Sequence, residues 1–177
     1  MEPQDRDLLK AFQDESKSLL DQMKDLLDKS EGDVAQAPLL EDYGNLVDRV
    51  MGGAKSLALL EKDPDHLIHK VADYAAICKA VGYKSSQVWD NEPFYEICVA
   101  LLMDATEILE SLIGRLTTDP TTVDMKALIN QQLIDRLKWV SAKFLADFRA
   151  SVDVSGVKKK RMSQNDIDGL LKKLGIG

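Results

Sequence analysis

The sequence predicts an all-α protein, an antiparallel helical bundle with a tethered C-terminal helix. Long stretches carry apolar residues at steps of three, four and seven, which is the spacing of one helix face. The 177 residues include only ten glycines and five prolines, and no short strands joined by Asn-Gly or Asp-Gly turns are visible. With 45% hydrophobic and 30% charged residues, the composition is that of a folded globular protein.

Residues 1–150 are expected to form the bundle, which begins with a helix over 5–29. Pro38 suits the first position of a second helix that continues to about Glu61, because proline lacks an amide hydrogen. Three glycines interrupt the second helix: Gly44, Gly52 and Gly53. Each costs about 1 kcal/mol relative to alanine. We therefore expect either a close approach by another helix or partner, or a break into two shorter helices.

Three more helices follow in the bundle. Asp63 is the expected N-cap of the third, which ends near Gly82. Asp90 or Asn91 caps the fourth, which stops near residue 117. For the fifth, Thr121 and an aspartate three residues later form a capping box, and its apolar stripe continues to residue 148.

Charge and composition exclude several classes of function. A formal net charge of −7 does not suit the phosphate backbone of nucleic acids. The chain has no apolar run long enough to span a membrane and no signal-peptide pattern at its start, so we expect a cytoplasmic protein with no membrane insertion. Cys78 and Cys98 lack metal-ligand spacing and are expected to be reduced, structural thiols. No metal site and no cofactor are expected.

The C-terminal end has a different character. Residues 151–161 carry a basic run and little apolar periodicity, which predicts a flexible linker. Residues 162–177 form a short helix with Ser163 and Asp166 as its capping box and Gly175 as its stop. Its apolar face consists of Ile167, Leu170, Leu171 and Leu174. Three turns are not stable alone in water, so the helix either docks in a partner's groove or folds back as a sixth helix of the bundle.

The segment Ser-Gln-Asn-Asp-Ile-Asp-Gly-Leu-Leu, residues 163–171, resembles the CheY-binding peptide of the FliM family, Ser-Gln-x-Glu-Ile-Asp-x-Leu-Leu. It is also similar to the C-terminal helix of the CheZ family. The resemblance covers about 13 of the 177 residues. It implies docking on a CheY-like receiver, with Ile167, Leu170 and Leu171 in the groove and Asp168 near a receiver lysine. The implied partner-binding residues are Ser163, Ile167, Asp168, Leu170, Leu171 and Leu174.

Over about 38–150 the body resembles a histidine-phosphotransfer (Hpt) domain, such as the one that opens CheA. In one register, within 67–83, Ala72 takes the place of the phospho-accepting histidine. In a second register, within 49–55, Gly52 takes it. Neither side chain can act as the nucleophile. Two histidines near the start of the third helix are alternative acceptors, His66 and His69.

A phosphatase of the CheZ type would require Asp-x-x-x-Gln on a bundle helix, and that pattern is absent. Two substitutes are candidates for catalytic residues: Asp42 with Asn45, and Gln131 with Asp135. Asp42 and Asn45 have a spacing similar to the Glu-x-x-Asn of the CheC and CheX phosphatases. Pairs of an acid and an amide on one helix face are also common on solvated surfaces.

These patterns predict a chemotaxis or two-component accessory protein that binds a CheY-like response regulator through its C-terminal helix. Its body would be an Hpt-like module that cannot be phosphorylated. One alternative is a CheZ-like phosphatase of phosphorylated CheY, for which any Mg²⁺ would belong to the receiver. Another is a helical scaffold with no receiver partner. Dimerisation through the first helix stays open.

Overall fold

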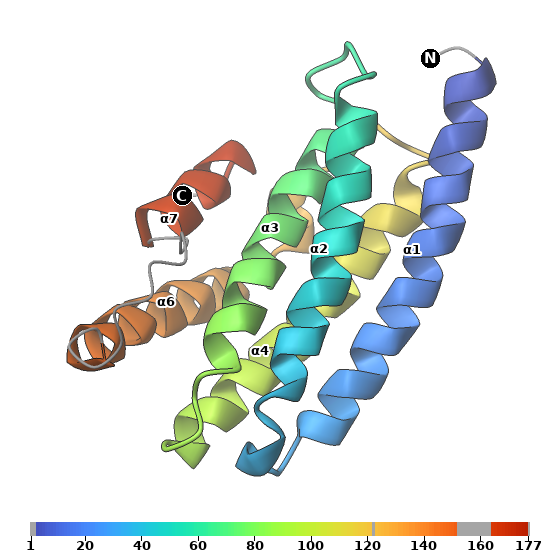
Figure 1. The fold of residues 1–177 in the computed structure, drawn as a ribbon. Helices are drawn as coiled ribbons and strands as arrows, with labels where there is room; N and C mark the ends of the chain where they lie inside the picture. Colours follow the sequence, from blue (N-terminus) through green and yellow to red (C-terminus); the bar gives the residue numbers. More distant parts are fainter. Residues whose placement is uncertain (1–2, 122, 152–163, 177) are drawn as a thin grey trace.

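The computed structural model describes residues 3–121, 123–151 and 164–176 (Figure 1). The regular secondary structure of these ranges is entirely helical, which confirms the predicted fold class. Along the described residues the helices are α1 Pro3–Ser30, η1 Val34–Gln36 (a 3-10 turn), α2 Leu39–Ala58, α3 Leu67–Ser85, α4 Glu92–Arg115, α5 Met125–Leu128, α6 Gln131–Ser151 and α7 Gln164–Lys173.

Helices α1 to α4 form an antiparallel four-helix bundle, in which each packs on the next and α4 packs back on α1 (Figure 1). α3 is enclosed because it contacts α2, α4 and α7, and most of its residues are buried. α6 lies outside the four, against α4 and α7. The four-helix part was expected over 38–150 with the first helix added to it, whereas these contacts close the bundle through α1.

Polar side chains join α1 to α4 near both ends of α4. The buried Gln13 donates from Nε2 to the carbonyl of Ile113 at 2.8 Å. The buried Tyr95 donates from its hydroxyl to the carbonyl of Ser30 at 3.0 Å, at the end of α1. Because helix ends leave carbonyls without intrahelical partners, these side chains both satisfy the backbone and set the register of the two helices.

The N-caps are partly as predicted. Asn91 caps α4 by accepting the amide of Phe94, which confirms one of the two expected residues. The expectation that Asp63 caps the third helix is wrong by three residues. The Asp63 carboxylate instead accepts the amide of Asp65 at 3.0 Å in the preceding turn. The cap of α3 is His66, whose backbone is extended.

The predicted fifth helix is two helices. Asp124, expected as the second member of a capping box, is itself the N-cap of α5 and accepts the amide of Lys126 at 2.9 Å. Ile129 then adopts an extended backbone and ends α5. Asn130 accepts the amide of Leu133 at 2.9 Å and so starts α6. A local side-chain cap therefore interrupts a stripe whose apolar spacing continues without a break.

Glycines in α2 and α3 allow these two helices to approach closely. A Cβ on Gly82 would lie 2.7 Å from Cδ1 of Tyr43, and a Cβ on Gly44 would lie 3.1 Å from the ring of Tyr83. Helix α2 is continuous from Leu39 to Ala58, so the close approach, and not a break, accounts for Gly44. Gly52 differs, because a Cβ there would meet nothing within 4 Å.

Replacing Gly82 by alanine should lower the free energy of unfolding by about 1 kcal/mol. Overpacking costs about 1–3 kcal/mol, which exceeds the helix preference that alanine adds. The Tyr43 ring cannot withdraw, because it is fully buried and its hydroxyl hydrogen-bonds Thr106. Urea denaturation followed by circular dichroism measures the change.

The matched control is Gly52→Ala, which is also inside a helix but has open space around it. It should raise the free energy of unfolding by up to about 1 kcal/mol. Equal effects of the two substitutions would contradict a close contact between α2 and α3 at Gly82.

Candidate functional site

Helix α7 ends in a C-terminal capping motif centred on Gly175. Gly175 has a φ of 74°, and its amide donates to the carbonyl of Lys172 at 2.9 Å. The amide of Ile176 donates to the carbonyl of Leu171 at 2.9 Å. These two hydrogen bonds form a Schellman motif, in which glycine is favoured because φ is positive. The prediction that Gly175 terminates this helix is confirmed.

The predicted anchors of α7 share one face, and that face is buried against the body. They are Ile167, Leu170, Leu171 and Leu174. α7 packs on α3 and α6, beside the upper half of α3 in Figure 1. Asp168 is half-buried. The side chains of the predicted capping box, Ser163 and Asp166, lie outside the described residues, as does the predicted linker beyond Ser151.

Sequence reasoning missed one member of this face. Ile176 follows the helix and is only 2% exposed. Schellman motifs commonly carry an apolar contact at the residue after the glycine. The Gly175-Ile176 pair was therefore a usable signal that the apolar face extends beyond Leu174.

Apolar contact is what joins α7 to the body. Between residues 167–176 and the described part of the body, no side-chain hydrogen bond or ion pair is seen. The charge of Lys173 acts on Asp73 of α3, where burial raises the pKa of the carboxyl and the lysine opposes that rise. Apolar contacts are not directional. The arrangement is thus a covered hydrophobic face with one complementary charge beside it.

The acid and amide candidates on α2 lie in an open groove between α1 and α2. Asp42 and Asn45 line it together with Asp25 and Lys29 of α1. Both α2 side chains are exposed. Tyr83 of α3 donates a hydrogen bond from its hydroxyl to Oδ1 of Asn45. The amide of Asn45 is therefore oriented by a neighbouring helix, and its N–H donors stay available.

A second polar pair stands beside this amide. Lys79 forms an ion pair with Asp48, and its ammonium lies 5.8 Å from the centre of the Tyr83 ring. Burial raises the pKa of the Tyr83 hydroxyl, and the nearby lysine opposes this. The hydroxyl therefore stays protonated at neutral pH and can donate to Asn45.

The other candidate pair is arranged differently. Gln131 donates from Nε2 to Oδ1 of Asp135 at 2.8 Å, and both are exposed at the start of α6. The acid and the amide hydrogen-bond each other, so neither is oriented toward a third group. α6 packs on α4 and α7, whereas α2 packs on α1 and α3. The fold does not bring the two candidate pairs into one site.

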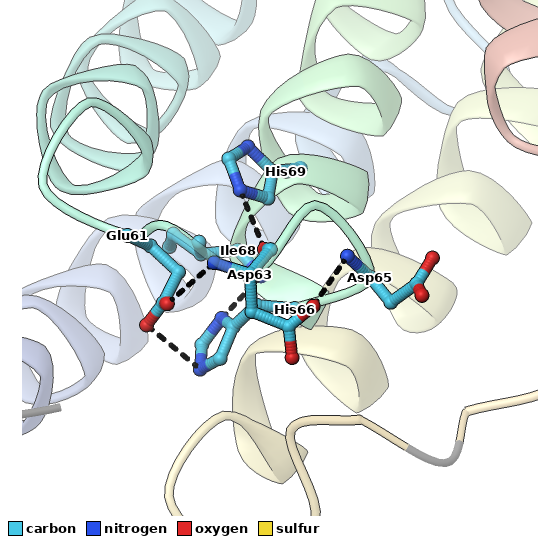
Figure 2. A network of polar contacts seen from close by, with 6 residues as sticks. All are labelled: Glu61, Asp63, Asp65, His66, Ile68 and His69. Atoms are coloured by element: carbon cyan, nitrogen blue, oxygen red, sulfur yellow. Dashed lines mark hydrogen bonds and ion pairs between the residues drawn. The ribbon is translucent and has the colours of Figure 1, made fainter.

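Both histidines take part in local structure at the start of α3 (Figure 2). The buried His66 accepts the amide of Ile68 at Nδ1, 3.2 Å away, so its proton is on Nε2, which lies 4.0 Å from a Glu61 oxygen. His69 is paired through Nε2 with the carbonyl of Asp63 at 3.1 Å. His66 in particular is not placed to reach a partner's phosphoryl group.

The two Hpt-like registers differ in where they place the missing histidine. Ala72 is 5% exposed and belongs to the hydrophobic core, so a reactive group there would be inaccessible to a kinase. Gly52 is on the exposed side of α2 with open space beside it. Of the two, only the Gly52 register corresponds to a surface position.

The described residues contain no group of three or more histidine, cysteine or acidic side chains that could hold a metal ion. Cys78 and Cys98 are free and buried, and burial raises the pKa of each thiol to about 12. Neither is therefore a thiolate at neutral pH. In the ranges that the structure covers, every helix is too short or too polar to cross a membrane.

Protonation of His66 should destabilise the fold. Burial lowers the pKa of His66, with His69 acting in the same direction and Glu61 and Asp63 opposing. The neutral ring is needed as the cap, so its contribution is present above the ordinary pKa of about 6.5 and is lost as the pH falls below it. Losing an N-cap costs about 1 kcal/mol.

The measurement is the free energy of urea unfolding between pH 8 and pH 5, for the native chain and for His66→Asn. Asparagine is a good N-cap that does not titrate. The native chain should lose stability relative to the variant as the pH falls through 6.5. A difference that stays constant over this range would show that His66 does not cap α3 as a neutral ring.

No protein-family model matches the chain, and no curated protein or solved structure gives a significant match. A functional proposal for this chain therefore rests on its sequence and on the geometry of α7 and of the groove between α1 and α2.

Proposed function

We propose that this chain is a cytoplasmic accessory protein of chemotaxis or two-component signalling that binds a CheY-like receiver through α7. The observation that carries the proposal is the single apolar face of this three-turn helix. Its anchors are spaced i, i+3, i+4 and i+7, which is the pattern of a helix that docks in a groove. The likeness of residues 163–171 to the FliM peptide supplies the kind of partner.

The charged residues around the face support the same proposal. Asp168 is half-buried next to the apolar face, and Lys172 and Lys173 are exposed. In the bound state, Ile167, Leu170 and Leu171 would fill the receiver's groove. Asp168 would pair with a receiver lysine and set the direction of the helix.

We propose that the body is an Hpt-like module that does not accept phosphate. In the register within 49–55, the position of the phospho-accepting histidine is on the surface, but Gly52 occupies it and has no side chain to react. His66 is buried as the cap of α3. A protein of this kind would hold a receiver or compete for it without taking its phosphoryl group.

A second candidate function is hydrolysis of the receiver's aspartyl phosphate, and the orientation of Asn45 favours it. Water attack on an acyl phosphate needs a group that positions the water, while the receiver's own Mg²⁺ balances the charge. Asn45, held by Tyr83 and adjacent to Asp42, is a pre-oriented amide of that kind. In this mechanism α7 would supply affinity and the groove would supply the chemistry.

Receiver binding should depend on the centre of the α7 face. Each large aliphatic anchor contributes about 1.5–3 kcal/mol when buried, before ordering costs. A peptide of residues 162–177 should bind a CheY-like receiver with micromolar affinity, and more tightly when the receiver carries a phosphoryl mimic. Leu170→Ala combined with Leu171→Ala should remove most of the affinity.

Fluorescence polarisation of labelled peptides measures this binding. Ser163→Ala is the control, because losing the predicted cap should cost only about 1 kcal/mol. Equal affinity of the native and doubly substituted peptides for several CheY-like receivers would mean that the sequence likeness is accidental.

If the chain is a phosphatase, Asn45→Ala should abolish its stimulation of phosphate loss from the receiver and leave binding unchanged. Tyr83→Phe should lower the rate at saturating receiver, since Asn45 would lose its orienting hydrogen bond. Gln131→Ala is the matched control and should have no effect, because Gln131 is paired with Asp135 on another helix. An unchanged rate of phosphate loss with saturating native chain would exclude the enzyme.

A further inference from the structure

We propose that the packing of α7 on α3 and α6 is an autoinhibited state, in which the body covers the helix face that binds the receiver. This inference rests on the proposed function, since it concerns regulation of the same face. The observation behind it is that the anchors expected to enter a receiver's groove are the residues that the body already buries.

The two docked states exclude each other. Ile167 is fully buried, Leu171 is 1% exposed and Leu174 is 3% exposed. Side chains this enclosed have no surface left for a second protein. A receiver can therefore bind α7 only after the helix has left α3 and α6.

The contacts that hold α7 are of a kind that can be exchanged. They are apolar, and residues 167–176 form no side-chain hydrogen bond or ion pair with the described part of the body. The receiver groove would offer the same kind of contact. Because three turns of helix are not stable in water, α7 needs one of the two surfaces in order to stay folded. The body and the receiver thus compete for one helix.

The competition lowers the measured affinity of the chain for a receiver. The affinity of the whole chain is reduced by the fraction of molecules whose α7 is released. If the docked form is about ten times as populated as the released form, the chain binds about tenfold more weakly than its released form. Strengthening the docking should weaken receiver binding, and weakening it should strengthen receiver binding.

A covalent cross-link between α3 and α7 tests whether stronger docking weakens receiver binding. Asp73→Cys on α3 and Lys173→Cys on α7 introduce thiols on two helices that pack together, at positions whose native charges act on each other. A short, reducible bismaleimide would join them in the docked state. The native Cys78 and Cys98 should not compete, because both are buried and their thiol pKa values are about 12.

The lock should form in the free chain, as seen by mass spectrometry, and should lower affinity for a CheY-like receiver bearing a phosphoryl mimic by tenfold or more. Cleaving the linker with a reductant should restore binding. The unlinked double variant is the control.

A charge reversal tests the opposite direction. Asp73→Lys replaces the carboxylate that attracts Lys173 by a cation that repels it, which should loosen the docked helix, so receiver affinity should rise severalfold. Glu107→Lys makes the same charge change on the exposed side of α4 and should leave affinity unchanged. A misfolded body would also release α7, so the gain counts only if urea unfolding shows that the Asp73→Lys body is as stable as that of Glu107→Lys.

The outcomes separate the inference from the proposed function. If the unlinked chain binds the receiver and the locked chain binds equally well, α7 is not inhibited by the body, although the proposed function stands. If Asp73→Lys and Glu107→Lys bind as the native chain does and the lock does not form, the docked state is not a competitor. If neither the chain nor the peptide of residues 162–177 binds any CheY-like receiver, both the inference and the proposed function fail.

Discussion

A reciprocal contact between α2 and α3 is the constraint on which the rest of the structure depends. Each helix contributes a tyrosine next to a glycine, and each tyrosine packs on the glycine of the other helix. Tyr43 lies over Gly82, and Tyr83 lies over Gly44. Tyr43 is fully buried, and its hydroxyl shares a hydrogen bond with the hydroxyl of Thr106 in α4. A bulkier residue at either glycine would push the helices apart, so this contact sets how closely the start of α2 and the end of α3 approach each other.

The orientation of the candidate amide on α2 follows from that contact. Tyr83 packs on Gly44, and in this position its hydroxyl reaches Asn45, one residue further along α2. The orientation of the amide is therefore a product of helix packing and not of local sequence. Helix α3 also packs against α7, and Lys173 of α7 acts on Asp73 of α3. One helix thus orients the amide of Asn45 and also packs against α7.

Apolar periodicity was sufficient to predict the all-α class, the first four helices and four of the five buried residues on the α7 face, because burial of a stripe is a local property of the sequence. It did not show the break between α5 and α6, which a side-chain cap makes. Caps with strong intrinsic preference, Asn91 and Gly175, could be predicted for the same reason. The cap of α3 could not, because histidine is a rare cap and His66 acts through a neutral ring that burial maintains. The docking of α7 could not be deduced either, since an apolar face specifies that it must be covered and not which surface covers it.

That ambiguity has a thermodynamic consequence. If one face is shared between the body and a receiver, the two equilibria are linked, and the free energy by which docking weakens receiver binding equals that by which the receiver weakens docking. A bound receiver would then expose the part of α3 and α6 that α7 covers. Any ligand of that surface would in turn release α7 and raise the affinity for the receiver. The apolar nature of the contact suits this exchange, because apolar contacts are not directional and each state replaces the buried area of the other.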